Sequence, residues 1–90
     1  MMFEVRWPDG TGRAYYSPSL VVQEYLEAGR EYPLEDFVTR CRESMTVAGD
    51  RVFARYGMRC AESAITLEAI ERAAATFEPA STVRVERFRT

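Results

Sequence analysis

The sequence contains no histidine, lysine or asparagine, and it has only two cysteines, Cys41 and Cys60. Without histidine, the chain lacks the commonest general base and the commonest metal ligand of proteins. Two distant cysteines and scattered carboxylates do not make a zinc site, and no glycine-rich phosphate loop or carboxylate pair stands out. We therefore expect no catalytic residues, no metal and no cofactor.

The chain also lacks long hydrophobic segments. No apolar run approaches the roughly 20 residues that span a bilayer, and the first ten residues, MMFEVRWPDG, have none of the apolar core of a secretion signal. The formal net charge of −2 gives no general attraction to nucleic acid or to an anionic membrane. We expect residues 1–90 to form a single cytoplasmic domain.

The basic residues are of one kind, since all twelve are arginine. The missing residue types, lysine and asparagine, have A/T-rich codons, so we infer a GC-rich bacterial genome. This origin explains the arginines without any special guanidinium chemistry.

The two cysteines are expected to differ. Cys41 lies within an apolar helical stripe and is predicted to be a small core residue. Cys60 lies at the expected start of a helix, beside Arg59, and both features lower the pKa of a thiol. Cys60 is therefore the candidate reactive thiol. A thiol packed in a tight turn is the alternative, because no histidine is available to act as its base.

The first thirty residues predict a hairpin followed by a helix. Residues 3–7 alternate apolar and charged side chains, which is typical of a half-buried strand, and Asp-Gly favours a two-residue turn. This turn would place Tyr16 in the core and Tyr15 on the outer face of the sheet. Ser17 and Pro18 favour the start of a helix that ends at Gly29. The expected cross-strand pairs are Trp7–Gly12, Val5–Ala14 and Phe3–Tyr16.

The rest of the chain predicts two more helices and a final strand. One apolar face persists from residue 34 to residue 56, which indicates a single long helix. A further helix is expected at 61–76, and 82–88 reads as a strand with Val83 and Val85 inward. The fold class is therefore α+β in the order ββαααβ. We expect a three-stranded, mainly antiparallel sheet with the helices packed on one face. The residues of the long apolar face are Leu34, Phe37, Val38, Cys41, Met45, Ala48, Val52 and Tyr56.

The outer face of this sheet is the candidate partner-binding face. Its expected members are Arg6, Arg13, Tyr15 and Arg84, interspersed with glutamates. Arginine and tyrosine are enriched in protein interfaces. They also stack on bases, but the neighbouring acids and the negative net charge disfavour nucleic acid. A merely solvated face is the third interpretation.

Four short motifs in order resemble a known family. They are V-R-W-P-D-G (5–10), Y-S-P-S-L (16–20), Y-P-L-x-x-F-V (32–38) and R-Y-G-x-x-C (55–60). The chain resembles, over about residues 3 to 77, small bacterial nitrogen-starvation-response proteins whose genes lie in a conserved cluster beside a nitrilase. The resemblance implies gene neighbours and no established activity, so it supplies no catalytic residues.

These observations favour a non-enzymatic accessory or regulatory protein that acts by binding an enzyme of the nitrilase cluster. The alternative is a small-ligand-binding module or minor enzyme that uses the crevice between helices and sheet together with Cys60. A closed homodimer formed through the short edge strands is a further alternative.

Overall fold

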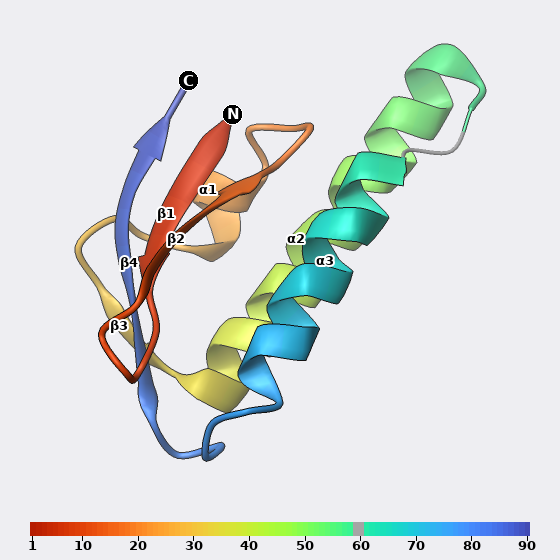
Figure 1. Cartoon of the computed structure of the whole chain (residues 1–90). Coiled ribbons are helices and arrows are strands. Elements are labelled where there is room, and N and C mark those ends of the chain that lie inside the picture. Colours follow the sequence, from red (N-terminus) through yellow and green to blue (C-terminus); the bar gives the residue numbers. More distant parts are fainter. Residues whose placement is uncertain (59–60) are drawn as a thin grey trace.

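The computed structural model of the chain describes residues 1–58 and 61–90. It has the α+β fold expected, and the long helix spans the predicted residues (Figure 1). The elements in chain order are β1 (Met2–Arg6), β2 (Gly12–Tyr16), α1 (Val22–Tyr25), β3 (Glu31–Pro33), α2 (Leu34–Tyr56), α3 (Ala61–Ala74) and β4 (Thr82–Arg89).

The sheet has four strands, not the three that we expected. Its strand order is β2-β1-β4-β3, and every neighbouring pair is antiparallel. The missed strand, β3, is only three residues long and ends in a proline immediately before α2 begins. So short a segment carries no alternating pattern, and it is a strand only because β4 lies beside it. The predicted order ββαααβ is therefore wrong, since β3 separates α1 from α2.

The β1–β2 register also differs by one residue from the prediction. Trp7 and Thr11 close the loop, with the amide of Trp7 donating to the carbonyl of Thr11 at 2.9 Å. Three residues thus lie between Trp7 and Thr11, and the last of them, Gly10, has the left-handed φ of 88°. A three-residue loop with a left-handed glycine is the next commonest hairpin after the two-residue turn. Because side chains alternate along a strand, this difference of one residue in loop length exchanges the faces on which Tyr15 and Tyr16 lie.

The core lies between one face of the sheet and the helices. Trp7 is buried in it among aromatic rings, stacked on Phe77 with centroids 5.8 Å apart and edge-on to Phe37 at 5.7 Å. Aromatic pairs in these geometries stabilise a core beyond their area of burial. The fully buried side chains of the strands are Phe3, Val5, Tyr32, Val83 and Val85, and those of the helices include Val22, Phe37, Cys41 and Ile70.

The segment between β2 and α1 is not the capped helix start that we predicted. The Ser17 hydroxyl is buried and donates to the carbonyl of Ser19 at 2.7 Å. Regular α-helix begins only at Val22 and covers four residues. The hydroxyls of Ser17 and Ser19 are engaged in local turns, which compete with helix formation at such residues.

Helices α2 and α3 form an antiparallel hairpin that diverges from the sheet. Its near end, where α2 begins and α3 ends, packs on the sheet, and its far end stands away from it (Figure 1). Gly49 allows the two helices to approach closely, since a Cβ there would lie 3.1 Å from Oγ of the buried Ser63. The predicted inward stripe holds from Leu34 to Ala48 but fails at Tyr56, which is 63% exposed.

Candidate partner-binding face

The candidate face is the side of the sheet that is turned away from the helices. Glu4 and Arg6 of β1 pair with Arg87 and Arg84 of β4, and cross-strand partners lie on the same face of a sheet. The pairing shifts between Glu4 and Val5, so β4 carries one extra residue, Glu86, at this point. Such an irregularity changes the alternation of the strand and re-aims the side chains beyond it.

Two glutamates of the face, Glu86 and Glu4, each hold two arginines. Arg6 Nε donates to Glu86 Oε1 at 2.6 Å, and Arg84 Nε lies 3.5 Å from Glu86 Oε2. In the neighbouring group, Nε of Arg87 and Nε of Arg89 lie 3.1 Å and 2.6 Å from the two carboxylate oxygens of Glu4. All four contacts use Nε, and a terminal nitrogen of Arg6 also donates to the carbonyl of Gly10 at 2.6 Å.

The charges of the face are unequal in number and in exposure. Four arginines against three glutamates, since Glu31 of β3 is the cross-strand partner of Arg84, leave a net charge of +1 on a chain whose total is −2. The arginine side chains are about half exposed or more, whereas those of Glu4 and Glu86 are 23% and 27% exposed. The hydrogen bond from Arg6 lowers the pKa of Glu86, so this carboxyl stays ionised and acts as a fixed anchor.

A shallow depression of about 460 Å³ lies on the same face. Its lining includes Gly12 and Ala14 of the edge strand β2, beside the long side chains of Glu4, Arg6 and Arg87. The depression forms because the outward residues of β2 are small while those of β1 and β4 are long. A charged surface with a hollow at one edge can bind a complementary surface.

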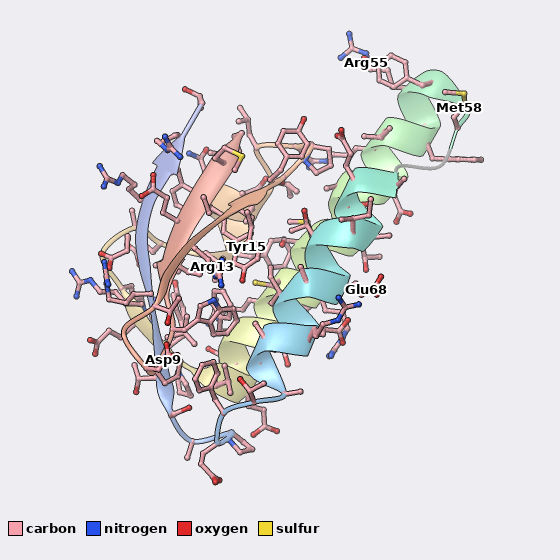
Figure 2. All side chains as sticks on the ribbon, viewed as in Figure 1. Asp9, Arg13, Tyr15, Arg55, Met58 and Glu68 are labelled. Carbon is pink, nitrogen blue, oxygen red and sulfur yellow. The ribbon has the colours of Figure 1, made fainter. Side chains whose placement is uncertain are left out.

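Two of the four predicted residues are on this face and two are not. Arg6 and Arg84 are cross-strand neighbours on the outer face, as predicted. Arg13 pairs with Val5 and Tyr15 with Phe3, which places both on the side of the helices (Figure 2). The cause is the three-residue loop, which shifts the register by one. Arg13 remains exposed there because β2 is an edge strand.

Tyr15 is thus half-buried, packs against the core and does not lie on the outer face. The indole Nε1 of Trp7 donates to its hydroxyl at 3.1 Å, and its ring lies 5.9 Å from that of Phe3. Burial raises the pKa of the Tyr15 phenol, and the hydrogen bond from Trp7 partly opposes this shift. Tyr16 is the exposed tyrosine, at 40%.

Arg87 and Arg89 belong to the face but were absent from our prediction. A regular strand with Val83 and Val85 inward would also turn residue 87 inward. The irregularity at Glu86 instead turns Phe88 towards the core, where it pairs with Phe3, and leaves the two arginines outward. The signal in the sequence was the apolar residue at position 88. It lies three positions after Val85, whereas regular alternation would place the next inward residue two positions after it.

The remaining predicted site residue, the candidate reactive thiol Cys60, lies outside the described residues. Cys41 is a free, fully buried thiol, which confirms its assignment to the core. Within residues 1–58 and 61–90, no group of three or more acidic or cysteine side chains is placed to hold a metal ion. In the same residues no helix is long and apolar enough to cross a membrane.

The fold and this face define a small α+β protein that presents a preordered, arginine-lined surface. The comparisons give its family. The family described as nitrogen starvation-induced protein NitG matches residues 2–88, and the chain belongs to this family. No curated protein and no solved structure matches the chain.

Proposed function

We propose that the chain is a non-catalytic accessory or regulatory protein, made in nitrogen starvation, that binds an enzyme through the outer face of its sheet. Membership of the nitrogen starvation-induced family supplies the setting. The observation that carries the proposal is the pair of glutamates that hold four exposed arginines by their Nε atoms. The enzyme is expected to come from the nitrilase cluster that the family resemblance implies.

The arrangement favours binding because part of the entropy loss has already occurred. A free arginine side chain loses up to about 2 kcal/mol of rotamer entropy when it is fixed. The ion pairs with Glu4 and Glu86 restrict these side chains before a partner arrives. The terminal nitrogens of Arg84, Arg87 and Arg89 can then meet a carboxylate in the two-point geometry that guanidinium groups form. The expected partner surface is therefore acidic.

The ion pairs of the face contribute too little to the free energy of unfolding to explain why the face carries them. Exposed arginine–carboxylate pairs contribute only about 0–1 kcal/mol each. Arginine is in turn one of the residues that are enriched in interfaces and in their energetic hot spots.

The test is a charge reversal with a matched control. The Arg84→Glu/Arg87→Glu variant reverses two arginines of the face. The Arg42→Glu/Arg72→Glu variant reverses two exposed arginines of the helix layer, each of which also has a glutamate partner. Both variants lower the net charge by the same amount. We expect the tagged wild-type chain to enrich one enzyme of the cluster from nitrogen-starved cells. The face variant should lose that enrichment, and the helix variant should keep it.

Binding of the purified enzyme, measured by calorimetry, gives the quantitative result. We expect a micromolar or tighter Kd that weakens by about tenfold or more in the face variant and weakens with rising salt. If the chain binds none of the cluster's enzymes at micromolar concentration, or if both variants lose binding equally, the proposal is wrong.

The alternative function, a small-ligand module or minor enzyme that uses Cys60, stays a prediction. The iodoacetamide rate of the Cys41→Ala variant tests it, because Cys60 is then the only thiol of the chain. A rate no faster than that of a model thiol at pH 7 removes Cys60 from consideration as an activated nucleophile.

A further inference from the structure

The far end of the α2–α3 hairpin carries apolar side chains that the fold does not cover. Phe53, Tyr56, Met58 and Ile65 are between 54% and 69% exposed. Of the six large hydrophobic residues that are exposed in the described chain, these four lie in this one segment. The segment stands away from the sheet, and Figure 2 shows Arg55 and Met58 at its tip. Clustered exposure of this kind marks interaction sites more often than scattered single residues do.

A groove runs between the two helices in the same region. Its volume is about 630 Å³, and its floor and walls include Met45, Phe53 and Leu67. Three small residues also line it, namely Gly49, Ala61 and Ala64, together with the polar Thr46, Asp50 and Ser63. Small residues allow another backbone to approach closely, while the larger ones offer apolar contact.

The groove opens to solvent and not towards the sheet. Thr66 and Ile70, which turn to the sheet side of α3, are buried, and the Thr66 hydroxyl donates to the carbonyl of Tyr16 in β2 at 2.7 Å. Phe53 and Ala64, which line the groove, are exposed. An occupant would therefore not compete with the core.

The dimensions of the groove match a short helix. Met45 and Phe53, near its two ends, are eight residues apart on α2, which corresponds to about 12 Å. Apolar anchors at positions i, i+3 or i+4, and i+7 of a helix span about 10 Å. Two turns of an amphipathic helix would thus place three anchors over the groove.

The charge around the groove indicates which helix would fit. Asp50 lines the groove, and the exposed Glu43 lies two helical turns earlier on the same face of α2. Neither takes part in the ion pairs that the structure shows between described residues. Together, α2 and α3 contain seven acidic residues and five arginines, so the hairpin is net negative where the outer sheet face is net positive.

We propose that this groove binds a basic amphipathic helix of a partner protein, with apolar anchors on Phe53 and Leu67 and a lysine or arginine beside Asp50. The site is separate from the outer sheet face and opposite to it in charge. With both sites occupied, the chain would join an acidic surface to a basic helix. The proposal does not depend on the proposed function, since the two sites are tested by different variants.

The test uses a model peptide as the probe. A fluorescein-labelled amphipathic peptide of leucine and lysine, about 14 residues long, is titrated with the full chain and followed by anisotropy. We expect a micromolar Kd, and we expect the leucine–glutamate peptide with the same apolar face to bind about tenfold or more weakly. Ala64→Trp, which fills the groove, and Asp50→Arg, which reverses its charge, should each weaken binding of the lysine peptide by about tenfold or more.

Two matched variants control for unspecific effects. Ala75→Trp adds the same side chain at an exposed position outside the groove, and Glu78→Arg makes the same charge change in the turn after α3. Both should bind as the wild type does, and circular dichroism should show that all four variants are folded. Equal binding by Ala64→Trp and Ala75→Trp, or no binding by the wild type up to about 1 mM, would overturn the proposal. A wild-type dimer that Ala64→Trp converts to a monomer would also overturn it, in favour of a second copy of this chain.

Discussion

At the scale of the single residue, Cys41 shows how position alone sets chemical behaviour. Its side chain has no exposure and lies among the core residues of α2. Burial in this apolar setting raises the pKa of the Cys41 thiol, since the charged thiolate would lose its hydration. Only the thiolate is a good nucleophile. Cys41 should therefore be inert as long as the protein stays folded.

The Cys60→Ser variant tests this prediction, because Cys41 is then the only thiol. We expect Cys41 to react with a thiol reagent only in the small fraction of molecules that are open. For a folding free energy near 5 kcal/mol, labelling is then slower by nearly four orders of magnitude, or about 5,000-fold, than in strong denaturant. The measurement compares labelling rates in buffer and in urea. Rapid labelling in buffer would mean that α2 opens readily in the native state.

At the same scale, Tyr15 and Tyr16 show that residue type alone does not determine which face of a strand a side chain occupies. Both are adjacent, both are aromatic, and either is suited to a core or to a partly exposed position. The assignment depends on whether the loop after Trp7 has two residues or three. The Asp-Gly pair is compatible with both loops, so the sequence favoured the commoner one and placed Tyr15 on the wrong face.

At the scale of the element, Gly49 determines how closely α2 and α3 pack. A glycine inside a helix costs about 1 kcal/mol relative to alanine, and here it makes room for Ser63. We expect Gly49→Leu to lower the free energy of unfolding by about 1–3 kcal/mol, because the larger side chain overpacks the contact between the helices. Urea unfolding followed by circular dichroism measures this change.

The matched control is Glu43→Leu, which places leucine at an exposed position of the same helix. Surface substitutions of this kind change stability by no more than about 0.5 kcal/mol. If Gly49→Leu were as stable as Glu43→Leu, the close approach of the two helices would have no energetic importance.

Helices and strands differ in how well the sequence specified them. Helix α2 was predicted with its observed bounds, because a continuous apolar face over 23 residues averages out local exceptions. Strand β3 was missed, because three residues are too few for a pattern. The irregularity in β4 was also missed, although it decides that Arg87 and Arg89 join the outer face.

At the scale of the whole molecule, the last strand in the chain, β4, connects the other strands of the sheet. β4 lies in the middle of the sheet, between β1 and β3, although it is last in the chain. Val83 and Val85 are fully buried in the core, and Phe88 packs against it. Burial of a large apolar side chain contributes about 1.5–3 kcal/mol. These three residues together therefore account for an amount similar to the entire stability of a small domain.

We expect truncation after Ser81, which removes β4, to abolish the cooperative unfolding transition. The measurement is urea unfolding monitored by near-ultraviolet circular dichroism and by the fluorescence of Trp7, the only tryptophan. Removal of Thr90 alone, which lies outside β4, is the control and should leave the transition unchanged. A cooperative transition in the shorter chain would show that residues 1–81 fold without their central strand.

The sequence by itself determined the fold class, the long helix, the inward valines of β4 and the membership in a nitrogen starvation-induced family. These properties follow from patterns within one segment, where periodicity and residue type act locally. The tertiary structure alone decided the fourth strand, the exchange of Tyr15 and Tyr16, and the grouping of Arg87 and Arg89 with Arg6 and Arg84. Each of these depends on how one strand pairs with another. One inserted residue in a loop or strand is enough to reverse the face on which a side chain lies.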